Sequence, residues 1–491
     1  MNILSDRFSE IKKASEPLYR TPKSVQETVE ILKISEGGIF EVAEGRYSKT
    51  YRFSDVNYAT RTENEQESFF QKYCKCLNSF DCTFKITVNN KNRDMEALRN
   101  EVMLGLRNDG FDEMRESYNR IIEEKILEGR QGIEQERYIT VTVKRKNFEE
   151  AKAQFATIES TMFKSFAELG SRLTPLSGNE RLRILHDYYR LGREDEFNFD
   201  IRKGKITGTD FRNEICNSSI KYYPNCFEDE GKVGRVLFIK KYPTYLSDRF
   251  FTELTFLPVH SITSVDVVPV PKDLTMKMLQ KKYLGIESDI IKQQRTRNRN
   301  NDFSSDISYS TRQKKRDIEE IMNNVRENDE SLFYVSVTMI VMAESRKELN
   351  SICKTIDSIA KGAGCAVDTY MYKQREAVNT TLPIGVRQIE TMRTMLTQSL
   401  AVLMPFNVQE LCDRDGIYYG VNQISRNIIV GNRKKLLNGN GFIFGVSGAG
   451  KSFQAKMEMG SVLLSTEDNV IAVDPMNEYE DVTEKYNGTY I

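Results

Sequence analysis

The sequence predicts a mixed fold, part α/β and part α+β. Strand-like and helix-like segments alternate twice in the order β-α-β-α over residues 81–380, and a Gly-rich strand–loop–helix segment follows near residue 450. The 491-residue chain is 39% hydrophobic and 29% charged, which is typical of packed globular domains. We therefore expect at least two packed domains and not a disordered chain.

Charge and apolar patterning exclude several classes of protein. Lys plus Arg and Asp plus Glu both number 71, so any attraction to nucleic acid or anionic lipid must be local. The N-terminus lacks the apolar core of a signal peptide, and the longest apolar run, at 332–343, is about half the length of a membrane span. The eight Cys and two His are scattered, which favours reduced thiols over a zinc site. A cytoplasmic protein is expected.

The first predicted region, residues 1–80, contains a small hairpin. Its first 30 residues are polar with helical spacing. Gly45 separates two short aromatic and β-branched runs, at 39–42 and 47–53, which is typical of a β-hairpin. An amphipathic helix is expected over 64–80.

The second region, residues 81–235, carries the first β-α-β-α unit. The expected elements are a strand at 82–88, a charged helix at 111–135, a strand at 138–144 and a helix at 147–169. The second strand alternates polar and apolar residues strictly. Asn147 has the position of an N-cap, because Glu150 follows three residues later.

The third region, residues 236–380, repeats this order. The expected elements are strand-like runs in 250–268, a charged helical stretch at 273–328, a strand at 332–341, a helix at 345–360 and a strand at 362–372. Ser345 has the position of an N-cap. Two β-α-β-α units of similar length indicate a duplicated split βαβ arrangement, which is the ferredoxin-like topology.

Two further segments connect these units to the Gly-rich loop. Residues 381–435 form a helical linker and an approach to the last domain, with a helix predicted at 385–404 before Pro405. Residues 291–316 are rich in Lys and Arg around a Ser/Asp/Asn-rich middle. This basic segment is either a solvated tip of a helical hairpin or a patch for nucleic acid or acidic lipid.

The last region, residues 436–491, begins with a complete phosphate-binding loop. Its residues match the pattern G-x-x-x-x-G-K-[ST]: Gly445, Val446, Ser447, Gly448, Ala449, Gly450, Lys451 and Ser452. An apolar strand at 441–444 precedes the loop, and a helix at 453–464 follows it. Backbone N–H groups through Phe453 then surround the phosphates of ATP at a helix N-terminus. Lys451 would reach the β- and γ-phosphates, and Ser452 would hold Mg²⁺.

A second acidic motif follows the next apolar run, at 469–473. It contains Asp474, Pro475, Glu478 and Tyr479. Three interpretations stay open. Asp474 and Glu478 lie near the phosphates at the end of a second strand, with Asp474 on Mg²⁺ and Glu478 in a catalytic role. Alternatively, Asp474 ends a Walker B strand, or both are turn residues, since Asp-Pro-x-Asn is a turn signal.

Together these motifs resemble the HerA–FtsK superfamily of P-loop ATPases. The tract LNGNGFIFGVSGAGKSF followed by VIAVDPMNEY is similar to the conjugal-transfer and type IV secretion system ATPases. The segment CDRDGIYYGVNQISRN at 412–427 resembles that family's approach to the ATPase core. The N-terminal GGIFEVAEGRYSKTYRFSDVNYA resembles the form found in conjugative elements of Gram-positive bacteria.

The resemblance implies a RecA-like motor domain behind a long docking region. It implies a homo-oligomer that uses ATP to energise assembly or substrate transfer of a secretion channel. Membrane channel subunits and a coupling ATPase that brings DNA are the implied partners, and the implied location is cytoplasmic, peripheral at the inner face of the cell membrane. Direct contact with DNA is a further possibility.

The sequence departs from the family at its C-terminal end. After Gly441 it contains only the first two strands of a RecA-like sheet and the helix that joins them. We therefore expect an incomplete, C-terminally truncated motor domain with weak nucleotide binding and without efficient hydrolysis. Two alternatives remain: a HerA-like DNA-translocating ATPase, and a non-catalytic scaffold that binds secretion-channel subunits.

Overall fold

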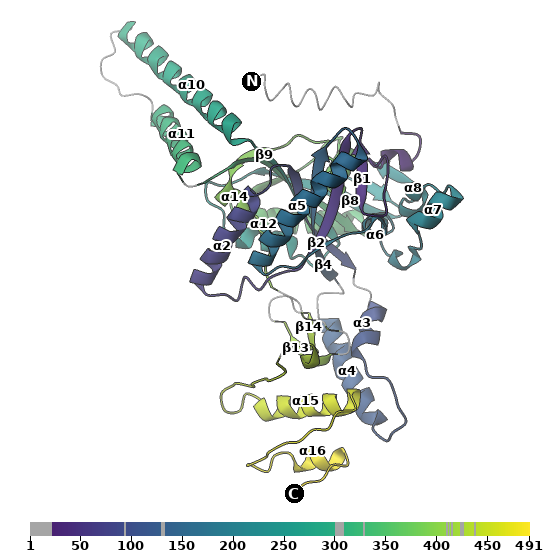
Figure 1. Ribbon diagram of the computed structural model, residues 1–491. Coiled ribbons are helices and arrows are strands. Elements are labelled where there is room, and N and C mark those ends of the chain that lie inside the picture. Colours follow the sequence, from purple (N-terminus) through teal and green to yellow (C-terminus); the bar gives the residue numbers. More distant parts are fainter. Residues whose placement is uncertain are drawn as a thin grey trace.

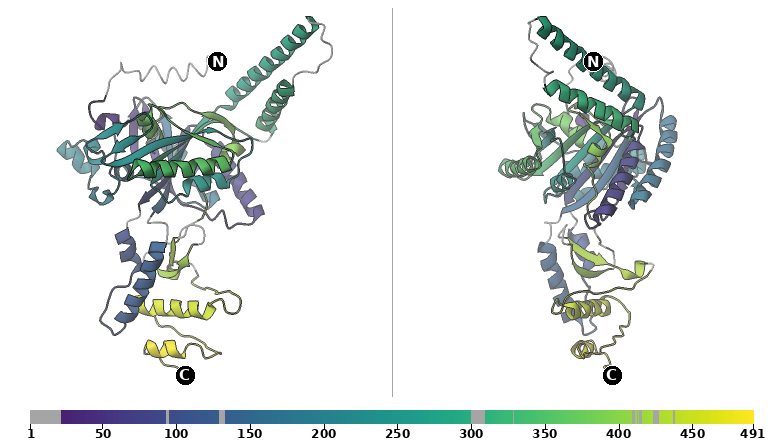
Figure 2. Two further views of the ribbon diagram at one scale, coloured as in Figure 1. Left: turned by 180° about the vertical axis from the view of Figure 1, so that it is seen from behind. Right: turned by 90° about the vertical axis from the view of Figure 1, so that its left-hand side faces the viewer.

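The chain forms a body built on one large sheet, with a projecting part at each end (Figure 1). The computed structural model describes residues 22–92, 95–128, 133–299, 309–327, 329–408, 411, 413, 416–422, 427–436 and 438–491. A helical hairpin, α10–α11, projects from one end of the body (Figures 1 and 2). The segment with the Gly-rich loop lies at the opposite end (Figures 1 and 2).

The body is a mixed α/β structure whose large sheet is antiparallel. Its main path runs β1-β2-β4-β3-β9-β10-β8-β7-β6, with β5, β11 and β12 paired at its margins, and β13 and β14 form a separate ribbon. The strands are β1 (Ile39–Ala43), β2 (Arg46–Phe53), β3 (Thr83–Asn92), β4 (Ile133–Lys144), β5 (Leu173–Pro175), β6 (Ile220–Tyr222), β7 (Phe227–Asp229), β8 (Lys232–Lys241), β9 (Ser261–Val270), β10 (Leu332–Ala343), β11 (Ala366–Thr369), β12 (Arg393–Leu396), β13 (Ile417–Val421) and β14 (Ile428–Gly431).

Helices connect these strands and cover the sheet. They are α2 (Glu63–Asn78), α3 (Met95–Val102), α4 (Asp112–Glu128), α5 (Phe148–Leu169), α6 (Gly178–Tyr189), α7 (Ile201–Thr207), α8 (Phe211–Ile215), α9 (Arg249–Thr255), α10 (Lys272–Arg299), α11 (Tyr309–Glu327), α12 (Arg346–Gly362), α13 (Gln374–Thr381), α14 (Thr397–Ala401), α15 (Lys451–Ser465) and α16 (Glu480–Lys485), with short 3₁₀ turns at Gln26–Thr28, Glu194–Glu196 and Arg433–Lys435. Within the described ranges, none of these helices combines the length and apolar content that a membrane crossing needs.

The sheet consists of two halves with the same strand order. The first half is β5-β2-β4-β3 and the second is β11-β8-β10-β9, and every neighbouring pair is antiparallel. The halves join where β3 pairs antiparallel with β9, so that Ile86 lies opposite Val265. Pairing two equivalent strands in this way relates the halves by an approximate two-fold rotation. The helical insertions α3–α4 and α10–α11, which follow β3 and β9, therefore lie at opposite ends of the sheet (Figure 1).

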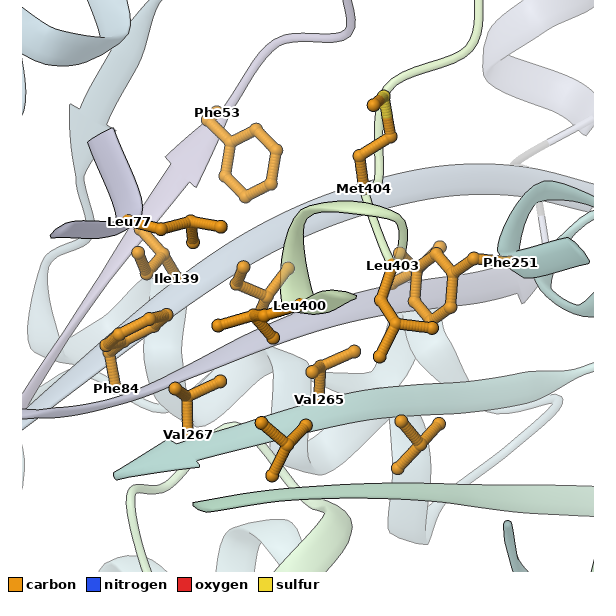
Figure 3. Close-up of a cluster of buried hydrophobic side chains, with 14 of the residues drawn as sticks. Phe53, Leu77, Phe84, Ile139, Phe251, Val265, Val267, Leu400, Leu403 and Met404 are labelled. Atoms are coloured by element: carbon orange, nitrogen blue, oxygen red, sulfur yellow. The ribbon is translucent and has the colours of Figure 1, made fainter. Parts of the chain in front are cut away.

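Apolar side chains on alternate strand residues form the main core on one face of the sheet. Phe84, Ile139, Val265 and Val267 contribute to it from β3, β4 and β9, and all are buried. Helices α2, α5, α9, α12 and α14 cover this face, and Leu400 of α14 packs over the strands (Figure 3). The two-residue period of a strand therefore places one set of residues under these helices.

In β2, β3 and β4 the intervening residues, such as Ser48, Lys85 and Thr140, are polar, yet they are also buried. In the second half of the sheet this face carries apolar side chains, including Val236 and Ile340. Residues 380–387, which we call the strap, cross this second face, and their backbone carbonyls accept hydrogen bonds from it. Five hydroxyl groups donate: Ser48 to Ile384 O (2.7 Å), Thr50 and Thr140 to Pro383 O (3.2 Å each), Thr142 to Gly385 O (3.2 Å) and Ser264 to Thr381 O (2.6 Å). The Lys85 ammonium donates to the carbonyls of Thr380, Leu382 and Val386. The strap thus satisfies polar groups that would otherwise be buried without partners.

A buried ion pair holds the end of the strap. The Arg387 guanidinium donates to both carboxylate oxygens of Asp266, at 2.6 and 2.8 Å. Asp266 lies opposite Lys85 in the β3–β9 ladder. The two cations and one carboxylate, together with the strap carbonyls, form a compact polar cluster at the centre of the sheet.

The C-terminal end of the molecule contains an element from the first half of the sheet. Helices α3 and α4, which fall within residues 81–235, pack against the β13–β14 ribbon. Their shared apolar cluster consists of Leu98, Val102, Tyr118, Ile122, Ile126, Ile428 and Val430. The insertion after β3 therefore supports the β13–β14 ribbon (Figure 1).

Several predicted elements are confirmed. The hairpin β1–β2 turns at Gly45, which has φ 67°. The Asn147 side chain accepts a hydrogen bond from Glu150 N, and that of Ser345 accepts one from Glu348 N, as expected of N-caps. Helices α2, α5, α12 and α15 lie where the sequence places helices. Most of residues 1–30 and the centre of the basic segment lie outside the described residues.

Three element predictions are wrong. The apolar run at 250–255 is helix α9, and the strand begins only at Ser261. Residues 385–392 form no helix, and the carbonyls of Gly385 and Val386 bind Thr142 and Lys85 of the sheet instead. Within the predicted 385–404 only α14 is helical. Residues 133–135, expected at the end of a helix, already belong to β4.

Gly385 is expected to be irreplaceable in the strap. Its φ is 85°, and a Cβ there would fall 2.5 Å from Thr142 Oγ1 and 2.7 Å from Ser48 Cβ. Gly385→Ala should lower the free energy of unfolding by about 2 kcal/mol or more, measured by urea denaturation followed by circular dichroism. Gly170→Ala is the control, because Gly170 has φ 78° with no atom near the added Cβ. Equal losses in the two variants would contradict a steric role for the strap.

Lys85 should make the stability depend on pH in the alkaline range. Burial lowers the pKa of Lys85 from 10.5 to about 8. Between these values the unfolded chain binds more protons at this residue, so stability rises with pH. The loss in the free energy of unfolding caused by Lys85→Met should therefore grow from pH 8 to 10.5. Urea denaturation across this range measures it, and a loss that does not change with pH would contradict the lowered pKa of Lys85.

Candidate functional site

The predicted phosphate-binding residues lie together at the N-terminus of α15. Helix α15 begins at Lys451, and Gly450 is its N-cap with φ 86°. Gly448 also has a positive φ, of 80°. Such backbone conformations favour glycine, and they let successive N–H groups turn toward one side. Ser447 is exposed, Ser452 is half-buried in the first helical turn, and the Phe453 ring is 69% exposed.

The Lys451 side chain folds back over the loop. Its Nζ donates to Gly445 O at 2.9 Å and to Val446 O at 3.0 Å. A Cβ on Gly445 would lie 3.3 Å from Lys451 Cγ, so the glycine leaves room for this side chain. The ammonium group is thus held at the loop, where a phosphate oxygen could replace the carbonyls as its partner.

The opposite end of α15 is fixed by two arginines from the α3–α4 insertion. Arg115, 1% exposed, donates from Nε to Leu464 O at 3.4 Å, and Arg107 donates to Ser465 O at 3.0 Å. Cations at the last carbonyls of a helix satisfy orphan acceptors and match the helix dipole. The Arg115 guanidinium also binds Asp109 and holds the pKa of that carboxyl well below its usual range.

The middle of α15 is tied to the ribbon that precedes the loop. Glu458 accepts from Tyr419 Oη at 3.1 Å and pairs with Arg433 at 2.7 Å. The Arg433 guanidinium lies over the Tyr419 ring at 5.3 Å. A Cβ on Gly441 would approach this guanidinium to 2.8 Å, so the chain entering the loop passes directly against Arg433.

The structure does not bring the second acidic motif onto the loop. Asp474 accepts from Tyr479 N at 2.7 Å and from Met476 N at 3.3 Å, which is the geometry of a side chain that stabilises a turn. Glu478 is exposed. Within the described part of the chain, neither carboxylate forms a hydrogen bond or ion pair with residues 445–452. Of the three interpretations, the turn role of Asp474 is the one with observed contacts.

The two apolar segments beside the loop are exposed. Phe442 and Phe444 are 81% and 87% exposed, and Ile471 and Val473 are 94% and 92% exposed. The strands predicted at 441–444 and 469–473 are not part of any ladder among the described residues 438–491. Apolar runs exposed on both sides are typical of strands that become buried inside a parallel sheet.

A magnesium ion at this site would depend on the nucleotide. Among the described residues, no three His, Cys, Asp or Glu side chains gather as a metal site. Mg²⁺ usually keeps several waters and takes one or two protein ligands together with phosphate oxygens. Ser452 lies in the first turn of α15 and is half-buried.

A second concave feature lies between the end of α6 and the β7–β8 turn. It is a cavity of about 270 Å³ lined by Arg190, Arg193, Asn217, Asp229 and Lys232, among others. Burial raises the pKa of Asp229 to about 7. Arg193 pairs with Glu230 and Lys232 pairs with Glu344, so these two cations are already neutralised by neighbouring carboxylates.

Sequence patterns alone do not reveal the residues that position α15. Arg107 and Arg115 lie more than 340 residues before the carbonyls they bind, as the separations of 358 and 349 residues show. The nearby acidic residues Asp109 and Asp112 are the local signal, because both precede Arg115 within two helical turns and pair with it.

Arg115 should be required for the stability of the C-terminal part. Arg115→Met leaves Asp109, Asp112 and the end of α15 without their common partner, with an expected cost of about 1–3 kcal/mol. Hydrogen–deuterium exchange should show faster exchange of the α15 amides in Arg115→Met than in wild type. Arg99→Met is the control, because Arg99 of the same insertion pairs with Glu123, both side chains remain partly exposed, and the loss should be under about 1 kcal/mol. Unchanged exchange in α15 of Arg115→Met would contradict this role.

Comparison with known proteins adds no assignment for this site. The sequence matches no protein-family model, and it matches no curated protein. The chemistry available at α15 therefore follows from its own geometry: a glycine-rich turn with left-handed residues, a lysine within hydrogen-bonding distance of the loop carbonyls, and a hydroxyl in the first helical turn.

Proposed function

We propose that the chain binds MgATP at residues 445–452 and belongs to a motor ATPase that energises a conjugative type IV secretion system. The observation that carries the nucleotide proposal is the loop at the N-terminus of α15, with Gly448 and Gly450 in left-handed conformations and Lys451 folded onto the loop. The narrower proposal rests on the resemblance of residues 412–427 and 438–479 to that family.

Binding would use groups that the loop already presents. Backbone N–H groups of residues 447–453 and the dipole of α15 would stabilise the phosphates. The Lys451 ammonium would exchange the Gly445 and Val446 carbonyls for phosphate oxygens, and the Ser452 hydroxyl would bind Mg²⁺. In this proposal Glu478 polarises water only if another conformation brings it to the loop.

The fold details belong to the same proposal. We take each half of the sheet as a ferredoxin-like unit, supported by the orders β5-β2-β4-β3 and β11-β8-β10-β9. We take residues 436–491 as part of a RecA-like domain, supported by the exposed apolar segments that flank the loop. The two-unit body would dock membrane channel subunits and a coupling ATPase at the inner face of the cell membrane, with the motor part acting as a homo-oligomer.

A non-catalytic scaffold is the second candidate. Two observations favour it. Asp474 stabilises a turn, and the exposed Glu478 side chain forms no described contact with the loop. In this case the sheet body would carry the function and the loop would bind nucleotide without turnover. A DNA-translocating ATPase of the HerA type is a further alternative, for which salt-dependent binding of DNA is the distinguishing property.

Lys451→Ala should weaken nucleotide binding. Isothermal titration of the full chain with MgATP is expected to show saturable binding, weakened at least about tenfold in Lys451→Ala because a charge-assisted contact to phosphate is lost. Lys456→Ala is the matched control, since Lys456 lies one and a half turns further along α15 and faces the Tyr479 ring at 5.7 Å. Equal affinity of wild type and Lys451→Ala, or no binding to wild type, would overturn the proposal.

A further inference from the structure

The outer face of α10 combines exposed cations with exposed apolar side chains. Six residues at helical spacing lie on this face, and all are exposed: Lys277, Lys281, Leu284, Ser288, Ile291 and Arg295. Leu284 is 63% exposed and Ile291 is 47% exposed. At 1.5 Å per residue the face extends for about 27 Å along the helix. We call these six residues the α10 stripe.

The opposite side of α10 is occupied by α11. Lys315 of α11 pairs with Glu287 at 3.0 Å and lies over the Tyr283 ring at 5.1 Å. Glu287 therefore turns away from the stripe. Asp289 comes one residue after Ser288, so it lies about 100° around the helix from the stripe. Between residues 277 and 295 the stripe therefore carries cations and apolar side chains without a carboxylate.

The position of the hairpin leaves this face open. At its base the two ends of the hairpin are joined by Lys272, which pairs with Asp329 at 2.6 Å. The hairpin contacts the body through Met278 of α10, whose sulfur accepts a hydrogen bond from Tyr334 Oη of β10 at 3.7 Å. Beyond the base it projects clear of the body, on the opposite side of the sheet from the P-loop (Figures 1 and 2). The β3–β9 pairing sets this geometry, because it sends the two helical insertions to opposite ends.

We infer that the α10 stripe docks on an anionic lipid surface. Its cations match the negative potential of acidic headgroups, and Leu284 and Ile291 are placed to enter the boundary with the acyl chains. The chain as a whole has no net charge, so the attraction arises from this local concentration of Lys and Arg. The inference extends the proposed place at a membrane and involves no nucleotide.

Other occupants fit the stripe less well. A second copy would bring like charges together. Phosphates of a nucleic acid would bind the cations, but Leu284 and Ile291 would gain nothing from them. A folded protein partner usually buries roughly 20–30 residues on each side, whereas the stripe offers two large apolar side chains.

Vesicle co-sedimentation of the full chain tests the inference. Wild type should bind vesicles of phosphatidylcholine with phosphatidylglycerol, and bind phosphatidylcholine alone at least about tenfold more weakly. Lys281→Glu with Arg295→Glu should weaken binding to the anionic vesicles by about tenfold or more. Leu284→Ser with Ile291→Ser should weaken it severalfold without changing the charge. All four side chains are exposed, so circular dichroism should show an unchanged fold.

The matched control is Lys314→Glu with Arg316→Glu on α11. Both residues are exposed, and the change in net charge is the same. This control should lose less than about threefold in vesicle binding, because its side chains lie outside the stripe. An equal loss in the control and the stripe variant would overturn the inference, as would equal binding to neutral vesicles or full binding by the Leu284/Ile291 variant.

A last experiment tests duplex DNA as the alternative partner of the stripe. Stripe-dependent binding to a labelled duplex in the absence of vesicle binding would replace lipid by nucleic acid as the partner. Because the assay contains no ATP, a chain that fails to bind nucleotide but sediments with anionic vesicles would reject the proposed ATPase and retain the α10 surface.

Discussion

Antiparallel pairing of β3 with β9 is the contact on which the architecture depends. It converts two four-stranded halves into one sheet and fixes which residues face each side, since a one-residue slip would exchange the two faces. In the observed register Phe84 and Val267 both point to the helical layer, while Lys85 and Asp266 both point to the strap. The same pairing sends the insertions α3–α4 and α10–α11 to opposite ends, one beneath the P-loop helix and the other into solvent.

The two faces of the sheet are stabilised by different chemistry. On one face, apolar area is removed from water beneath five helices, which is the dominant favourable term in folding. Where the strap crosses the other face, hydroxyl groups and the Lys85 ammonium are buried beside a second apolar cluster, and burying these polar groups costs free energy unless each finds a partner. The strap carbonyls supply those partners. An extended segment serves here better than a helix, because the carbonyls of a helix are already bonded within it.

Local signals allowed much of this to be predicted from the sequence. The N-caps Asn147 and Ser345 and the P-loop motif act over fewer than ten residues, and each lies in the expected element. The β-α-β-α order of strands and helices in the two units was also visible in the sequence. Residues 385–392 were predicted as part of a helix, because the partners of the Gly385 and Val386 carbonyls lie in strands 243 and 301 residues earlier and leave no periodic trace in this segment. For the same reason, nothing in the sequence indicates that Arg107 and Arg115 bind the end of α15.

Apolar content alone also did not decide the state of the segments around the P-loop. Residues 441–444 and 469–473 have the composition of buried strands, but composition cannot supply the neighbouring strands that a ladder requires. In the described chain their side chains face solvent. The phosphate-binding loop nevertheless keeps its local geometry, because glycine conformations and a helix N-terminus are properties of a few consecutive residues.

The strap has a consequence for the order in which the chain can fold. Its carbonyls bind Ser48, Lys85 and Thr140, which are synthesised 336, 295 and 243 residues earlier. Until residue 387 has left the ribosome, these groups lack their strap partners, and the loop-closure entropy of joining such distant segments must be overcome late. The polar face of the first half is therefore completed only when the second half of the chain is present.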